Sequence, residues 1–395
     1  RSPSRGLGDV YKRQLKYMGS KREILSFVID TIQKTGVESN YFCDLFAGTA
    51  LVGSAFKHQY RVHINDIQSY SSIFAQAYLY NLKTSAPLGV IENIHEKALS
   101  YVNDLTAHTP ELIADYSKIT HLDNLQRLEE QQRELLHSDI HTGFHLFTKY
   151  YSGTYWSYEQ CAWIDSIRAA AETYRNTLIY GAILSALVYA MSYTSQGTGH
   201  FAQYRDITAA NMQDVLIYRT KQIWPLFEKK FHELITTIDS DPLHTPHLTS
   251  LNYIDCLKIV EPKSIIYADP PYSAVHYSRF YHAIETLVKY DYPDIRYKAR
   301  YRCDRHQSPF CTKTQVHQAF RDLFHCTHER NSHLFLSYSN SGMISIEELQ
   351  QIANTILGSK YKQKVFVMNH MHSRMGSADT YGSYVKEYIL AFTQS

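Results

Sequence analysis

Residues 265–272 read Ile-Ile-Tyr-Ala-Asp-Pro-Pro-Tyr, an apolar run followed by an acid, two prolines and an aromatic ring. The apolar run predicts a buried strand, and Asp269 then lies where that strand is expected to end. Open α/β sheets bind their ligands at the carboxyl ends of strands. A carboxylate and a proline-fixed carbonyl can accept hydrogen bonds from an amino group, while the tyrosine ring stacks on the planar ring that bears this amino group. Such an arrangement favours a nucleobase ligand. For these four residues alone, an ordinary turn is an equal interpretation.

Two earlier segments favour the ligand site over the ordinary turn. Residues 41–56 read as a strand, a turn of small residues around Gly48 and the start of a helix. A glycine turn between a strand and a helix suits the close approach of a cofactor to backbone amides. Residues 61–66 read as another strand that ends in Asp66, near the distance at which nucleotide-binding βαβ units place their ribose-binding acid. Together these patterns favour a ligand site at Asp269.

At this point the chain resembles the DNA adenine N(6)-methyltransferases that use S-adenosylmethionine, of the type represented by the bacterial DNA adenine methylases. The resemblance covers residues 15 to about 80 and 250–395 well and the middle poorly. One position departs from the family, because Ala50 stands where its Phe-x-Gly-x-Gly motif has the second glycine. The segments that carry the resemblance, in the family's order, are Leu15–Lys21, Asp44–Gly48, Asn252–Asp255, Asp269–Tyr272 and Leu334–Ser339.

The resemblance also implies which residues bind the cofactor. Tyr17 and Lys21 would lie near its methionine part, and Asp66 would accept from its ribose hydroxyls. Asp255 would accept from its adenine amine. The full cofactor-binding set is Tyr17, Lys21, Asp44, Phe46, Gly48, Asp66 and Asp255.

The catalytic residues implied by the resemblance are Asp269, Pro270, Pro271 and Tyr272. Adenine's exocyclic amine is a poor nucleophile because its lone pair is delocalised into the ring. If the Asp269 carboxylate and the Pro270 carbonyl each accept one N–H, the lone pair turns toward the methyl donor. The base must first leave the duplex, and Tyr272 would stack on it.

DNA contacts are expected from two regions. Residues 289–305 are rich in arginine, lysine and tyrosine and follow the catalytic motif, so they suit phosphates and displaced bases, although a solvated basic loop is the plainer interpretation. Two loops, 151–158 and 195–201, are rich in glycine, hydroxyls and aromatics, and such loops are as often plain turns. Arg279, in residues 276–282, is expected at the pocket or its rim, with a helix packing face as the equal alternative. The expected contacts are Tyr155, His200, Arg205, Arg279, Arg296, Lys298, Arg300 and Arg302.

The expected fold is α/β, a Rossmann-like, mostly parallel methyltransferase sheet of seven strands, a number that comes from the resemblance. Residues 15–81 and 250–395 would form the catalytic domain, and 82–249 a mainly helical insertion for target recognition. The apolar stretch Leu178–Tyr193 predicts a buried helix and falls short of a membrane span. Residues 1–14 lack an apolar period and are expected to be a disordered tail or a cloning remnant.

Composition agrees with a cytoplasmic enzyme. A net charge of +2 does not by itself indicate a DNA-binding protein, so that case depends on where the basic residues lie. The chain has six cysteines and no Cys-x-x-Cys pair, as expected for reduced thiols. Cys303, His306, Cys311 and Cys326 match no common zinc spacing, and no metal is expected.

The resemblance therefore implies methyl transfer from S-adenosylmethionine, leaving S-adenosylhomocysteine, to N6 of a flipped adenine in double-stranded DNA. The setting would be a bacterial or phage restriction-modification system, with a cognate restriction endonuclease as partner, or an orphan methylase. Three alternatives stay open. Related sheets methylate RNA or protein amides with an Asn-Pro-Pro-Tyr variant, others methylate cytosine with a motif that usually begins with Ser, and a non-catalytic DNA-binding relative would retain the fold.

Overall fold

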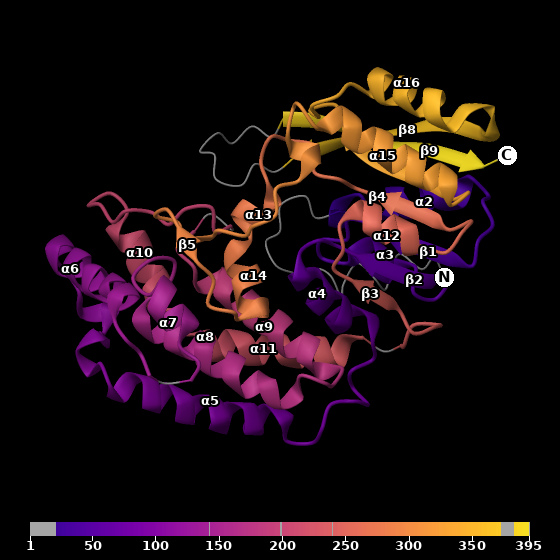
Figure 1. Ribbon diagram of the computed structural model, residues 1–395. Coiled ribbons are helices and arrows are strands. Elements are labelled where there is room, and N and C mark those ends of the chain that lie inside the picture. The colour runs from indigo at the N-terminus through magenta and orange to yellow at the C-terminus, as the bar shows by residue number, and fades with distance from the viewer. Residues whose placement is uncertain (1–20, 142, 198–199, 239, 373–382, 395) are drawn as a thin grey trace.

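A seven-stranded sheet forms one half of the molecule in the computed structural model, which describes residues 21–141, 143–197, 200–238, 240–372 and 383–394 (Figure 1). The strand order is β3-β2-β1-β4-β7-β9-β8. The first five strands are parallel, and β9 runs antiparallel to both of its neighbours. The mostly parallel sheet of seven strands is confirmed. The strands are β1 (Tyr41–Asp44), β2 (Arg61–Asn65), β3 (His247–Thr249), β4 (Ile265–Ala268), β7 (His333–Ser339), β8 (Tyr361–His372) and β9 (Ser383–Gln394).

Helices cover both faces of the sheet because successive strand residues point to opposite sides. Phe42 packs on the face covered by α2 (Leu25–Lys34), α3 (Leu51–Ala55) and part of α4 (Ser69–Leu79). Cys43 packs on the opposite face, under α12 (Tyr253–Ile259), α15 (Val316–Glu329) and α16 (Ile346–Leu357). All four residues of β4 are buried, as expected for a central strand covered on both sides.

The second half of the molecule is helical (Figure 1). Its centre is α9 (Ile179–Thr194), which is buried along almost its whole length, so the helix expected at 178–193 is confirmed. None of the described helices is long and apolar enough to cross a membrane. The other helices here are α5 (Val90–Ala107), α6 (Leu122–Arg133), α7 (Leu146–Tyr151), α8 (Tyr158–Ala171), α10 (Met212–Arg219) and α11 (Ile223–Thr237).

The two halves share one apolar core. Tyr70 and Phe74 of α4 and Ile284 and Leu287 of α14 (His282–Lys289) belong to the same buried cluster as α9. The helical half therefore includes residues outside 82–249, and β3, just inside that range, belongs to the sheet. The division into a catalytic domain and a target-recognition insertion stays a prediction, and residues 1–14 lie outside the described part of the chain.

Short elements connect these parts. Between the catalytic strand and α15 lie α13 (Tyr277–Phe280), a hairpin of β5 (Ile295–Arg296) and β6 (Tyr301–Arg302), and the 3-10 helix η6 (Pro309–Cys311). The other 3-10 helices are η1 (Lys21–Glu23), η2 (Pro110–Leu112), η3 (Tyr116–Lys118), η4 (Glu134–His137), η5 (Glu172–Tyr174) and η7 (Gly358–Lys360).

Candidate active site

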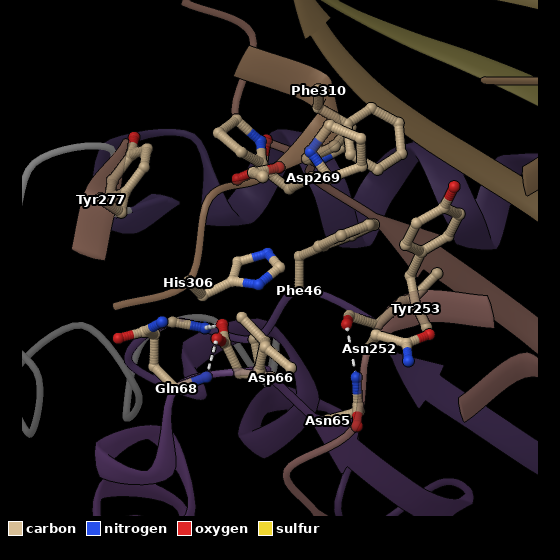
Figure 2. A pocket seen from close by; sticks show the side chains of 18 of the residues that line it. Phe46, Asn65, Asp66, Gln68, Asn252, Tyr253, Asp269, Tyr277, His306 and Phe310 are labelled. Carbon is tan, nitrogen blue, oxygen red and sulfur yellow. Dashed lines mark hydrogen bonds between the residues drawn. The ribbon is translucent and has the colours of Figure 1, made fainter. Parts of the chain in front are cut away.

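A cavity of about 560 Å³ lies at the carboxyl ends of β1, β2 and β4 (Figure 2). Parallel strands end at the same edge of a sheet, so segments that are distant in sequence meet there. The expected residues that line it are Lys21, Asp44, Phe46, Gly48, Asp66, Asp269, Pro270, Pro271 and Tyr272. Tyr17 lies outside the described residues.

The glycine turn is held by two carboxylates. The Gly53 amide donates to Asp44 Oδ2 at 2.7 Å, and the Gly48 and Gln68 amides donate to the two oxygens of Asp66, each at 2.8 Å. Burial raises the pKa of Asp44 to about 7 and that of Asp66 to about 6. Both acids therefore fix the loop that forms the cavity wall and also line the cavity.

Ala50, at the departure from the family's glycine motif, adopts a left-handed backbone conformation with φ 59° and ψ 22°. Gly48 in the same turn has φ 53°. Glycine populates this region freely, whereas a residue with a Cβ is held there at a cost of about 1 kcal/mol or more. The loop thus keeps the backbone path that a glycine would favour, and alanine adopts it under strain.

Lys21 connects the catalytic motif to the end of the chain. Its Nζ lies 3.0 Å from Asp269 Oδ1 and 3.7 Å from Glu387 Oε2, and all three side chains are largely buried. Burial opposes the lysine charge, but Asp269 and then Glu387 outweigh it and hold the pKa of Lys21 well above its usual range. Burial raises the pKa of Asp269 to about 6, although Lys21 works against that rise.

Glu387 is a site residue that the sequence motifs did not reveal. It lies in β9 opposite Ser339 of β7. Its sequence signal is a charged residue directly before the apolar run 388–392, where a buried strand would otherwise be uncharged. Four carboxylates, Asp44, Asp66, Asp269 and Glu387, thus lie in or beside the cavity, with Lys21 as the cation paired with two of them.

Aromatic rings gather at one end of the cavity. Phe46 lies edge-on to Phe310, with ring centroids 5.4 Å apart, and stacks near Tyr253 at 6.0 Å. Tyr277 and His306 line the cavity away from this cluster, on the other side of Phe46 in Figure 2. Sequence reasoning missed Phe310 and His306 as lining residues, because they come from segments without a recognised motif. It also missed Tyr253, because the segment Asn252–Asp255 was interpreted through its acid alone.

Asp255 does not occupy the position expected of it. Asn252 caps α12, so residues 252–255 begin a helix and do not end a strand. The Asp255 carboxylate is 49% exposed and pairs with Lys258 Nζ at 2.9 Å, and only the three preceding residues line the cavity. The assignment of Asp255 to the cofactor is therefore not supported, and Asn252 is the polar side chain of this segment that lines the cavity.

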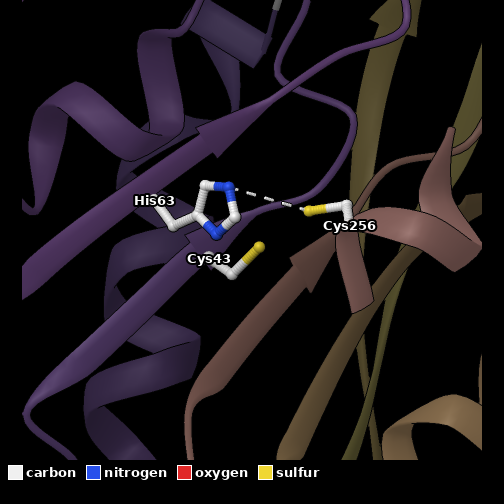
Figure 3. Close-up of side chains that lie close together, drawn as sticks. All are labelled: Cys43, His63 and Cys256. Carbon is white, nitrogen blue, oxygen red and sulfur yellow. Dashed lines mark hydrogen bonds between the residues drawn. The ribbon is translucent and has the colours of Figure 1, made fainter. Parts of the chain in front are cut away.

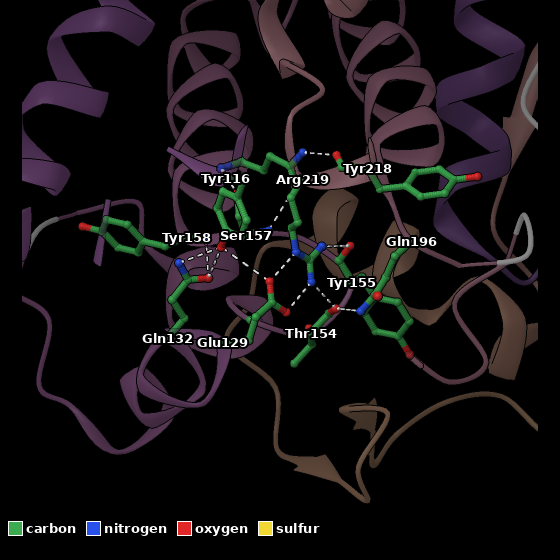
Figure 4. A network of polar contacts seen from close by, with 12 residues as sticks. Tyr116, Glu129, Gln132, Thr154, Tyr155, Ser157, Tyr158, Gln196, Tyr218 and Arg219 are labelled. Carbon is green, nitrogen blue, oxygen red and sulfur yellow. Dashed lines mark hydrogen bonds and ion pairs between the residues drawn. The ribbon is translucent and has the colours of Figure 1, made fainter. Parts of the chain in front are cut away.

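Tyr155, expected to contact DNA, is completely buried. Its hydroxyl donates to the carbonyl oxygens of Phe201 and Ala299, and its own carbonyl accepts from Arg219 at 2.8 Å (Figure 4). Tyr155 is a core residue of the helical half in this conformation, so the expected DNA contact is wrong for its side chain.

The basic residues that were expected to contact DNA differ in their exposure and in their ion pairs. Arg302 is 2% exposed and is held by Asp291 at 2.6 Å and Asp304 at 2.9 Å, so it is a structural residue and the DNA contact expected of it is wrong. Arg205 pairs with Asp214 and Lys298 with Asp206 on the surface. The other expected contacts are half-buried His200, which packs on Phe280, exposed Arg279 and Arg296, and half-buried Arg300.

Comparison with known proteins identifies the group to which this site belongs. The family model of D12 class N6 adenine-specific DNA methyltransferase matches residues 17–355. The chain is 23% identical over 353 residues to Modification methylase LlaI of Lactococcus lactis subsp. lactis, covering 86% of this chain and 48% of the relative. It is 26% identical to Modification methylase StsI of Streptococcus sanguinis, covering 86% and 46%. It is 24% identical to Type II methyltransferase M.NlaIII of Neisseria lactamica, covering 86% and 87%. The chain thus spans about half the length of the first two relatives.

Proposed function

The chain belongs to the family of D12 class N6 adenine-specific DNA methyltransferases, and on that premise we propose that it methylates N6 of a specific adenine in double-stranded DNA. The observation that carries the proposal is the meeting of Asp269–Tyr272 with Lys21 and the glycine turn around one cavity. The relatives named as modification methylases support a role in restriction-modification, with a cognate endonuclease as the partner.

The cavity suits S-adenosylmethionine by its charge and by the chemistry of its lining residues. Its carboxylates outnumber the paired lysine, so a ligand with a net positive charge relieves their repulsion. Lys21 suits the ligand's carboxylate, Asp66 the ribose hydroxyls, and the cluster of Phe46, Tyr253 and Phe310 an apolar ring face. The bound cofactor supplies a methyl group on a positively charged sulfur.

The chain's own residues then activate the amine. Asp269 and the Pro270 carbonyl accept the two N–H bonds of the adenine amine, which turns its lone pair away from the ring. Lys21 keeps Asp269 oriented and favours its ionised form. Methylation leaves a surplus proton on the nitrogen, and a carboxylate with a pKa of about 6 takes up such a proton readily near neutral pH.

The rim of the cavity offers groups for a flipped base and for phosphate. Tyr272 and Tyr277 line the cavity near Asp269 and are suited to stack on the base. Arg279, exposed in α13, directly follows cavity residue Ser278, and Arg296 lies exposed in the neighbouring hairpin. We assign these two arginines to backbone contacts that position the duplex. Target recognition falls to the helical half.

The test is transfer of labelled methyl groups to unmethylated plasmid DNA, followed by single-molecule mapping of modified bases. N6-methyladenine in one short sequence context supports the proposal. Asp269→Ala should reduce the rate by at least about 10³-fold, because the amine loses its main acceptor. Cofactor binding, measured by calorimetry, should remain in that variant. Methylation of RNA or protein in place of DNA, or full turnover by Asp269→Ala, would contradict it.

A further inference from the structure

Three potential metal ligands converge on the sheet face opposite α2 and α3 (Figure 3). Cys43 of β1 and His63 of β2 are direct partners across parallel strands, so their side chains share one face. Cys256 reaches them from α12, which covers that face. Within the described part of the chain, the two sulfurs and a ring nitrogen of His63 all lie within 4.8 Å of one another. None of the four residues weighed as a zinc pattern from the sequence belongs to this group.

The cluster is buried and has a fourth polar atom beside it. Cys43 is 1% exposed, Cys256 is 0% exposed and His63 is 9% exposed. His63 Nε2 lies 3.9 Å from Cys256 Sγ and 2.8 Å from Thr249 Oγ1. The Thr249 hydroxyl donates its proton to Asn65 Oδ1 at 2.8 Å, so without a metal its lone pairs accept the proton of His63 Nε2. A metal at Nε2 requires the other neutral tautomer, with the proton on Nδ1, and both thiols release their protons. Two sulfurs, one nitrogen and one oxygen therefore gather in a space shielded from water.

We propose that Cys43 Sγ, Cys256 Sγ and His63 Nε2 bind one Zn²⁺ ion, with the Thr249 hydroxyl next to the fourth coordination position. Two thiolates and an imidazole are a soft donor set that selects zinc over magnesium or calcium. Tetrahedral zinc with ordinary bond lengths places its ligand atoms about 3.5–3.8 Å apart. The 3.9 Å separation between Cys256 Sγ and His63 Nε2 already approaches that spacing, and small side-chain rotations would close the rest.

The ion would be structural and would act on the cavity through its wall. Cys43 directly precedes Asp44, and Cys256 lies one turn after Asn252 and Tyr253, which line the cavity. Asn65, which accepts from Thr249, also lines it. Zinc would thus join β1, β2 and α12 behind the cavity and fix three parts of its wall relative to one another. No step of the methyl transfer needs it.

The test is the metal content of the purified chain after growth with added zinc and removal of loosely bound ions by gel filtration. We expect about one zinc per chain by mass spectrometry. The double variant Cys43→Ser with Cys256→Ser should lose it. Cys161→Ala is the matched control, because Cys161 is an equally buried thiol in α8 outside the cluster, and it should keep its zinc.

A second measurement covers the case in which the double variant fails to fold. Co²⁺ exchanged into the unaltered protein should give the intense visible absorption of a tetrahedral site together with thiolate-to-cobalt charge transfer. Absence of that charge-transfer band, zinc at background in the unaltered protein, or zinc retained in a folded double variant would each overturn the proposal. These readouts do not depend on methyl transfer, so they stand whether or not the proposed activity is found.

Discussion

Two buried charge networks in this molecule are built in opposite ways. In the helical half, Arg219 contacts both oxygens of Glu129, at 2.5 and 2.6 Å, and also donates to the carbonyls of Thr154 and Tyr155 (Figure 4). At the cavity, Lys21 is shared between Asp269 and Glu387, with Asp44 and Asp66 nearby. One network has one carboxylate for its cation, and the other has a surplus of carboxylates.

The difference separates a structural network from a functional one. A balanced, fully hydrogen-bonded pair is complete and holds its region in one arrangement. A surplus of buried negative charge is unfavourable on its own. The raised pKa values of Asp44 and Asp269, which burial causes, reflect this cost of keeping the carboxylates ionised. A cationic ligand would remove that penalty. In the helical half, by contrast, Arg219 already compensates the charge of Glu129 within the folded chain.

The same substitution in the two networks should give different results, and the largest effect is expected for Glu129→Gln. It leaves Arg219 buried without its countercharge, so the free energy of unfolding should fall by about 3–5 kcal/mol. Urea denaturation followed by circular dichroism measures this. A loss below about 1 kcal/mol would show that the network is not structural.

Glu387→Gln makes the identical chemical change at the cavity and should leave the free energy of unfolding within about 1 kcal/mol. Removing one of the surplus charges lowers the attraction for a cation, so the Kd of S-adenosylmethionine should rise about tenfold. Calorimetry on both Gln variants gives the comparison. If Glu387→Gln unfolds the protein as Glu129→Gln does, the distinction between the two networks fails.

The pH dependence of cofactor binding sharpens the comparison further. The pKa of Asp44 is raised to about 7 and those of Asp66 and Asp269 to about 6, so these carboxylates take up protons as the pH falls through that window. A cation favours their ionised forms, and its Kd should therefore rise several-fold between about pH 8 and about pH 5.5. S-adenosylhomocysteine lacks the sulfonium charge and serves as the control, with a shallower slope expected. If the Kd values of the two ligands changed equally with pH, the surplus of carboxylates would not be what attracts the cofactor.

Backbone strain gives the smallest expected effect. Ala50 in the cavity wall has a positive φ, whereas between residues 82 and 249 no described residue other than glycine does. Ala50→Gly should relieve the strain, offset in part by the greater freedom of glycine in the unfolded chain, for a net stabilisation of about 0.5 kcal/mol. Differential scanning calorimetry would register a small rise in Tm. A clear fall would show that the Cβ packing at this buried position outweighs the strain.

The α/β arrangement around Asp269 and the centre of the site were predictable from local patterns, whereas the seven strands were expected only from the family resemblance. An apolar run before Asp269 and a small-residue turn after residues 41–46 place their polar residues at strand ends, and parallel topology then brings them together. Glu387 and Phe310 were not predictable in this way. Phe310 lines the cavity through the path of its loop, and Glu387 reaches Lys21 through the order of the strands. A short window of sequence can show that the charge of Glu387 is unusual in a strand, but it does not record these positions.

The errors also have physical causes. Asp255 was expected to accept from the cofactor's adenine amine, but Asn252 caps a helix in which the Asp255 carboxylate faces solvent. Arg302 was read as an exposed phosphate contact, although Asp291 and Asp304 stand close by in the sequence as ready partners. A tyrosine such as Tyr155 in a glycine-rich loop can be a surface residue or a core residue. Only tertiary packing decides between the surface and the core.

The order of strands has a consequence for synthesis. β9 comes last in sequence among the described strands, yet it lies between β7 and β8 in the sheet and carries Glu387. At typical translation rates, tens of seconds separate the appearance of β1 from that of β9. For the last part of that time the nascent chain holds Asp269–Tyr272 without the strand that carries Glu387. The contact between Lys21 and Glu387 therefore cannot form until β9 has been made, so the charge pattern beside the cavity is completed late in synthesis.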